Sequence, residues 1–138
     1  MTKRKIRKEL NLITKICETV LGENLISLVL FGSTARGDSK VISDIDICLI
    51  VKEYPSKDWM LGGMIKHKCF LEGIPTLVEP IFLEKEDLKI PSPLLYELSR
   101  DGVVIAGHDV LPELKEISGQ IKPLFGKGGE KIGWQTTG

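Results

Sequence analysis

The sequence has no excess of charge of either sign, because its 19 basic residues are balanced by 19 acidic ones among 138 residues. Proteins that bind extended nucleic-acid duplexes usually carry a basic excess, so the balance argues against nucleic acid as the main ligand. Cysteine is also scarce: Cys17, Cys48 and Cys69 are odd in number, widely spaced and set in apolar patterns. They indicate reduced thiols in a cytoplasmic protein, not a disulfide framework or a zinc site.

Long hydrophobic runs are missing too. No apolar run reaches the roughly 20 residues that cross a bilayer. The charged start, MTKRKIRKEL, is not followed by the uninterrupted apolar segment of a secretory signal. We therefore expect a cytoplasmic protein without membrane contact. The length and a hydrophobic fraction of 42% suit one globular domain.

What is present is an alternation of helical and strand patterns. Apolar residues recur at helical spacing over 3–21 and, weakened by two glycines, over 56–71. Strand patterns, rich in β-branched and large apolar residues, cover 26–31, 44–52, 75–84 and 103–107. This order predicts one α/β (α+β) domain with helices packed on a small sheet.

Proline, serine and glycine residues predict further details of one strand and one helix. Pro80 cannot donate a hydrogen bond within a sheet, so its strand is predicted to lie at an edge or to carry a bulge. Ser92 as N-cap, Pro93 at the first helical position and Gly102 past the end frame a short helix.

The composition changes after Leu111, where Gly and Lys become frequent and periodicity fades. We predict a domain over 1–118 and a flexible C-terminal tail over 119–138. Trp134 could dock on the domain or on a partner, or belong to a loosely held terminus.

The start of the second strand pattern carries two acids. Asp44 and Asp46 stand one residue apart, so alternation in a strand points them the same way, about 7 Å apart. Two adjacent carboxylates repel unless a positive group lies between them. Mg²⁺ supplies that charge and prefers a few carboxylates together with phosphate oxygens and water. Solvated strand-edge residues or a helix cap are the alternative for the pair alone.

A turn suited to phosphate precedes the acid pair. Gly32 has no side chain and lets a phosphate approach the backbone. A helix that begins near Ser33 would direct free N–H groups at an anion, and the Ser33 hydroxyl adds a donor. Arg36 is close enough to reach the same phosphates, or could instead brace the turn by pairing with Asp38 or Asp44.

The string LVLFGSTARGDSKVISDIDICLIV, with Gly-Ser, ten residues and then Asp-apolar-Asp, resembles the DNA polymerase beta-like nucleotidyltransferase superfamily. It looks like the minimal nucleotidyltransferase branch, whose small members are often encoded beside a HEPN-domain partner. The resemblance is specific over 28–51 and extends more weakly to about residue 107. It implies a small mixed, largely antiparallel β-sheet with helices packed on it.

The resemblance also implies a third carboxylate on a neighbouring strand. Glu79 matches that position best, although the family more often has aspartate there. Glu72 is a weaker candidate because it lies at the end of a predicted helix. Glu79 could alternatively be an exposed strand residue.

The implied activity is attack by an acceptor hydroxyl on the α-phosphate of a nucleoside triphosphate, ATP in the first instance, with release of pyrophosphate. Asp44, Asp46 and Glu79 would hold two Mg²⁺ ions, and Glu79 would act as general base. Gly32, Ser33 and Arg36 would bind the phosphates. The acceptor would be a hydroxyl such as a tyrosine of a HEPN-type toxin, which makes the chain antitoxin-like.

One alternative function stays open at this point. The fold could survive as a non-catalytic module that binds a nucleotide or a HEPN partner without turnover. Oligomers are also possible, because small domains of this kind expose apolar faces that a partner covers.

Overall fold

The computed structural model describes residues 3–36, 44–55, 58–74, 77–119, 121–125 and 131–136. Within these ranges, the side chains of residues 3–6, 33, 36, 58, 121–125 and 131–136 lie outside the description.

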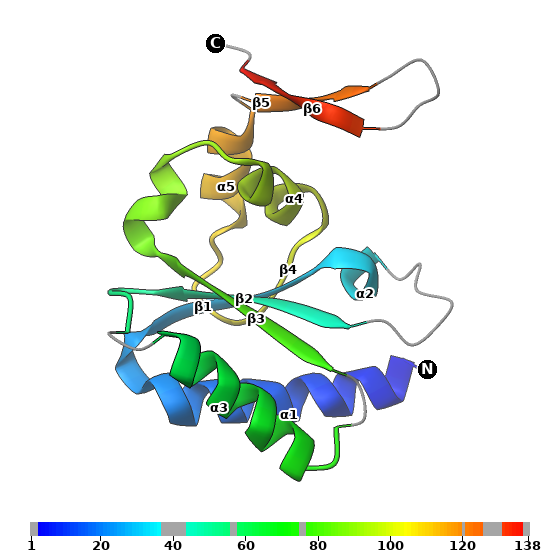
Figure 1. Cartoon of the computed structure of the whole chain (residues 1–138), viewed down its shortest axis with the longest axis vertical. Coiled ribbons are helices and arrows are strands. Elements are labelled where there is room, and N and C mark those ends of the chain that lie inside the picture. The colour runs from blue at the N-terminus through cyan, green and yellow to red at the C-terminus, as the bar shows by residue number, and fades with distance from the viewer. Residues whose placement is uncertain are drawn as a thin grey trace.

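Helices and strands alternate along the first 118 residues (Figure 1). The elements are α1 (Lys3–Leu21), the 3₁₀ turn η1 (Gly22–Asn24), β1 (Leu25–Phe31), α2 (Gly32–Arg36), β2 (Ile45–Val51), α3 (Asp58–Leu71), β3 (Val78–Glu84), the 3₁₀ turn η2 (Lys85–Lys89), α4 (Pro93–Asp101), β4 (Val103–Gly107), α5 (Leu111–Ser118), β5 (Ile121–Phe125) and β6 (Lys131–Thr136). The two long helices and four strands predicted from the sequence are confirmed, whereas α5, β5 and β6 were not predicted.

The main sheet has the strand order β3-β2-β1-β4. β1 is antiparallel to both β2 and β4, while β2 and β3 are parallel. The predicted mixed, largely antiparallel sheet with packed helices is therefore confirmed.

β3 lies at an edge of this sheet, as Pro80 predicted. The carbonyl of Leu77 accepts a hydrogen bond of 2.8 Å from the N–H of Ile45 in β2. Because backbone groups alternate in direction along a strand, those of Val78 and Pro80 face the free edge. The missing N–H of Pro80 therefore removes no bond from the sheet.

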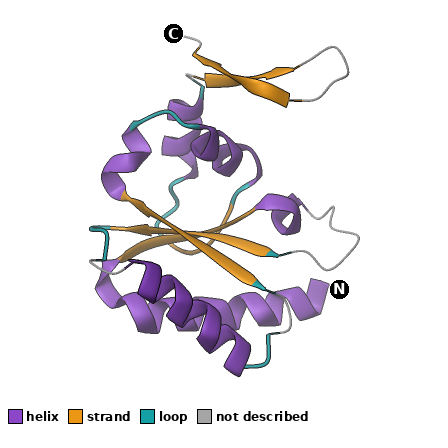
Figure 2. Ribbon diagram, viewed as in Figure 1, coloured by secondary structure: helices purple, strands orange, loops and turns teal. Residues whose placement is uncertain are grey.

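Helices cover both faces of the sheet (Figure 2). One core lies between the sheet and α1 with α3, and contains Ile47, Leu49 and Ile65. The other lies against α4 and α5, and contains Cys48 and Ile50. Alternation along β2 thus assigns its odd-numbered residues to α1 and α3, and its even-numbered residues to α4 and α5.

The caps of α4 also match the sequence. The Ser92 hydroxyl accepts a hydrogen bond of 3.2 Å from the N–H of Leu95, and Pro93 opens the helix. Gly102 follows the last turn and donates its N–H to the Leu98 carbonyl at 2.8 Å.

The C-terminal segment contains an antiparallel hairpin of β5 and β6, in which Ile121 pairs with Thr136. It lies beyond α5 in Figure 1, apart from the main sheet. These strands fall within the segment predicted to be a flexible tail, and the division after residue 118 stays a prediction. The side chain of Trp134 is outside the described part of the structure.

None of the helices among the described residues combines the length and the apolar character that a membrane span requires.

Candidate active site

A close approach between Gly32 and Asp46 defines one end of the sheet. β1 ends at Phe31, which pairs with Asp46 across the antiparallel strands, and α2 begins at Gly32. Gly32 has a φ of 78°, in the left-handed region. A Cβ built on Gly32 would overlap Oδ2 of the Asp46 carboxylate. Glycine therefore leaves the space in which this carboxylate rests.

Asp46 also lies beside Glu79. The two residues are register partners on the parallel strands β2 and β3, and both side chains are half-buried. Backbones of neighbouring strands are about 4.8 Å apart, and register partners leave the sheet on the same face. That face is the one covered by α4 and α5, since Cys48 and Ile50 belong to it.

Asp44 lies one residue before β2 and is exposed. The Thr34 hydroxyl in α2 donates a hydrogen bond of 3.4 Å to the Asp44 carbonyl. This bond ties the start of β2 to the short helix that follows Gly32. The predicted shared face of the Asp44 and Asp46 side chains stays a prediction, because Asp44 precedes the regular strand.

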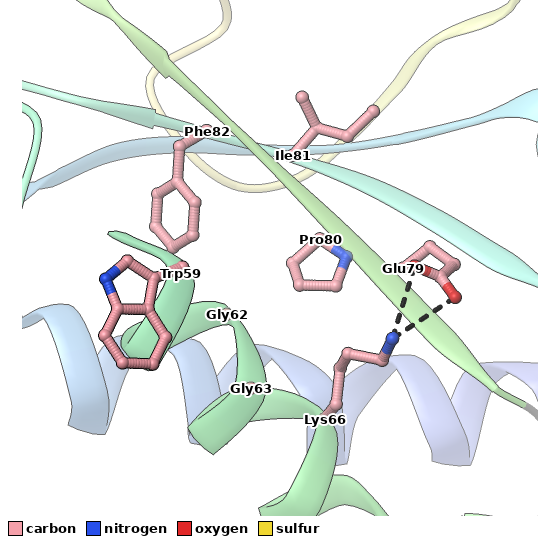
Figure 3. Close-up of a pocket in the computed structure, with 8 residues that line it drawn as sticks. All are labelled: Trp59, Gly62, Gly63, Lys66, Glu79, Pro80, Ile81 and Phe82. Atoms are coloured by element: carbon pink, nitrogen blue, oxygen red, sulfur yellow. Dashed lines mark hydrogen bonds and ion pairs between the residues drawn. The ribbon is translucent and has the colours of Figure 1, made fainter. Parts of the chain in front are cut away.

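The carboxylate of Glu79 is held by Lys66 of α3 (Figure 3). The Lys66 Nζ lies 3.3 Å from Oε1 and 3.4 Å from Oε2 of Glu79. Each side chain is 38% exposed, so the pair is partly solvated. The sequence did not predict this contact, because 13 residues and two different elements separate the partners.

Within the described ranges, no three His, Cys, Asp or Glu side chains gather closely enough to hold a metal ion. Asp44, Asp46 and Glu79 would therefore have to come closer together to form a three-carboxylate site. Mg²⁺ is commonly bound by only one or two carboxylates together with substrate phosphates and water. The oxygen donors of Asp44, which is exposed, and of Asp46, which is half-buried, fit such a site.

An open groove adjoins Glu79, with a volume of about 440 Å³. Its walls come from α3 and β3 and include Trp59, Lys66, Pro80 and Phe82 (Figure 3). At Gly62 the helix runs close to the strand, and a Cβ built there would lie 3.7 Å from the rings of both Pro80 and Phe82. Sequence reasoning assigned no role to Trp59; its separation of seven residues from Lys66 was the available signal, since it places both on one side of a helix.

The remaining predicted ligands of phosphate are described only by their backbone. Ser33 and Arg36 belong to α2, but their side chains lie outside the described part of the structure. Asp38, the alternative partner of Arg36, lies outside it entirely.

Cys48 shares the strand and the face of Asp46 but is fully buried. Burial raises the pKa of its thiol to about 12, so the thiolate is not available as a nucleophile at neutral pH. Cys48 is a small core residue in this site.

The sequence matches a family described as "Nucleotidyltransferase domain" over residues 4–106. A Methanocaldococcus jannaschii protein with the name "Putative protein adenylyltransferase MJ1305" is 32% identical over 120 residues, covering 79% of this chain and 80% of the relative. A second protein from that organism, with the name "Putative protein adenylyltransferase MJ0141", is 45% identical over 42 residues, which is 30% of this chain and 42% of that relative.

Solved structures share the fold at lower identity. A toxin–antitoxin structure with AMP-PNP has a TM-score of 0.58 and 19% identity, covering 79% of this chain and 80% of its own. A complex of a tri-AMPylated Shewanella oneidensis HEPN toxin with MNT antitoxin gives 0.56 and 18%, covering 78% and 77%. Spectinomycin adenyltransferase from Enterococcus faecialis gives 0.61 and 18%, covering 80% of this chain and 58% of the enzyme.

These neighbours show that the chain shares the fold of solved nucleotidyltransferases, with a four-stranded sheet in the order β3-β2-β1-β4. The chain belongs to the nucleotidyltransferase domain family, and the predicted resemblance to minimal nucleotidyltransferases is confirmed.

Proposed function

We propose that this chain transfers AMP from ATP to a hydroxyl group on a protein. The observation that carries the proposal is the Asp46 carboxylate, seated against Gly32 and in register with Glu79. The 32% identical relative, whose name denotes protein adenylyltransfer, supports AMP as the group and protein as the acceptor.

Each site residue has a role in this proposal. Gly32, Ser33 and Arg36 would bind the triphosphate. Asp44 and Asp46 would hold Mg²⁺, and Glu79 would contribute to a second ion. Bound Mg²⁺ would offset the negative charge that develops on the phosphates. Glu79 takes the proton of the acceptor hydroxyl. The hydroxyl oxygen forms a bond to the α-phosphorus as the bond to pyrophosphate breaks.

Two labelled forms of ATP test the transfer. With Mg²⁺ and an acceptor protein, ATP labelled at the α-phosphate is expected to label the acceptor covalently. ATP labelled at the γ-phosphate is expected to leave it unlabelled, because that phosphate departs in pyrophosphate. Transfer of the γ label would indicate a kinase reaction, and no transfer of either label would contradict the proposal.

The acceptor we propose is a tyrosine of a HEPN-type toxin, with the chain acting as its antitoxin. A fold neighbour in complex with an AMPylated HEPN toxin supports this choice. So does the outer face of α3, because apolar side chains gathered on a surface mark contacts with other proteins. Half of the ten exposed large apolar side chains of the described part belong to this helix: Trp59, Met60, Met64, Phe70 and Leu71.

We expect the double substitution Phe70→Ser and Leu71→Ser to weaken binding to a HEPN-domain protein from the same genome by about tenfold or more. These side chains are 74% and 67% exposed, so the fold does not depend on them. Calorimetric titration of the two purified proteins would measure the change. Ile90→Ser is the matched control, since Ile90 is 65% exposed but lies outside α3. If the parent, the double variant and Ile90→Ser bind with equal affinity, the partner binds a surface other than α3.

The same apolar face favours a second candidate function, a partner-binding module without turnover. That function predicts tight binding of the HEPN-type protein and no transfer of the α label under any condition. The ion pair between Glu79 and Lys66 is compatible with a module that does not catalyse transfer. The labelling experiment separates the two functions.

A further inference from the structure

The Glu79 carboxylate meets Lys66 at the edge of the sheet that β3 forms. Val78 and Phe82 pack in the core beneath α1 and α3, and Leu83 packs in the opposite core. Alternation therefore sends Glu79 from β3 toward the face of α4 and α5, where Asp46 lies. Its two oxygens nevertheless contact Lys66 of α3, on the other face, at 3.3 and 3.4 Å.

The edge position of β3 makes this possible. Among the described strands, β3 pairs with β2 alone, so no strand separates Glu79 from Lys66 at the free edge. The ion pair is 38% exposed on each side and borders the open groove (Figure 3). A Cβ built on Gly63, near Lys66 in α3, would meet nothing within 4 Å. The groove therefore leaves space on α3 into which the Lys66 side chain can move.

The ion pair between Lys66 and Glu79 reduces the repulsion between two neighbouring carboxylates. Asp46 and Glu79 are register partners, so two carboxylates turned the same way would repel in the absence of a cation. Lys66 supplies a positive charge to Glu79 from the α3 side. A divalent cation at Asp46 would supply it from the opposite side and would compete for the same carboxylate.

We propose that Lys66 is a positioning residue that competes with the divalent cation for Glu79. It holds this carboxylate away from Asp46 until the cation binds, and Glu79 then turns around the sheet edge to join the site. The inference rests on the proposed function, because it needs a cation at Asp44 and Asp46.

Titration of the full chain with Mn²⁺ in the absence of nucleotide tests the competition. The electron paramagnetic resonance signal of unbound Mn²⁺ decreases as the ion binds, so its loss gives the Kd. Lys66→Met keeps most of the side chain but removes the charge, and is expected to lower the Mn²⁺ Kd about two- to fivefold, the range for a partly exposed pair. Lys66→Arg should return the parental Kd. Lys68→Met is the matched control, because it removes an equal charge from an exposed position of α3.

The background of Glu79→Gln isolates the mechanism. There, adding Lys66→Met is expected to leave the Kd unchanged, since no carboxylate remains to be released. If Lys66→Met leaves the Kd unchanged in the parent, or acts no more strongly than Lys68→Met, the competition is disproved while the cation site stands. If Asp46→Asn binds Mn²⁺ as tightly as the parent, or if the parent binds none, the cation site of the proposed function is disproved. The proposed competition is then disproved as well.

Discussion

Asp46→Asn is expected to lower the rate of AMP transfer about a thousandfold or more, which corresponds to about 4 kcal/mol of transition-state stabilisation. The amide has the size of the carboxylate but no charge with which to hold a divalent cation. It keeps the half-buried contact with Gly32. It also removes one of two adjacent negative charges, Asp46 and Glu79. The melting temperature should therefore stay near that of the parent, and single-turnover transfer of the α label measures the loss.

Glu72→Gln is the matched control for this variant. It makes the same chemical change at an exposed residue that follows α3, and it replaces the other acid considered as the third carboxylate. We expect parental transfer rates from it. If Asp46→Asn retains transfer, the metal role of Asp46 is wrong, and if Glu72→Gln loses transfer, the third carboxylate is Glu72.

The elements that the sequence predicted are those whose signals are local. The N-cap hydroxyl of Ser92 and the ring of Pro93 determine the start of α4 with their own atoms. The apolar run of β2 reads as a strand at any position in a protein, and Pro80 excludes β3 from the centre of a sheet. Gly32 and Asp46 were found because the Gly-Ser and Asp-apolar-Asp pattern joins two neighbouring apolar runs, which pair as β1 and β2.

What the sequence did not predict depends on contacts between distant segments. Lys66 reads as an ordinary solvated lysine of a helix, and only the packing of α3 against β3 brings it to Glu79. α5 has eight residues, too few for a strong periodic signal, and is held by the burial of Leu114 against α4 and the sheet. The strands β5 and β6 are held by backbone hydrogen bonds to each other. A segment rich in Gly and Lys has no side-chain pattern that predicts this pairing.

Gly32→Ala should both destabilise the fold and lower the rate of AMP transfer about a hundredfold. At a φ of 78° any side chain is strained, by about 1–2 kcal/mol for alanine. Here the new Cβ would also overlap Oδ2 of Asp46, so the carboxylate must leave its position or β1 and β2 must separate at this end. Displacing a catalytic carboxylate by an ångström is enough to lower a rate about a hundredfold. Denaturant unfolding and transfer of the α label would measure the two effects.

Gly73→Ala separates the overlap from the backbone strain. Gly73 has a similar φ of 84°, but a Cβ built there meets nothing within 4 Å. It should therefore lose only the 1–2 kcal/mol of backbone strain and keep the parental transfer rate. In the double variant Gly32→Ala with Asp46→Ala, removal of the overlapping carboxylate should recover part of the lost stability without restoring transfer. Equal destabilisation by Gly32→Ala and Gly73→Ala would show that Asp46 does not rest against Gly32. The close approach that joins the turn to the acid pair would then be lost, and with it the basis for assigning both to one site.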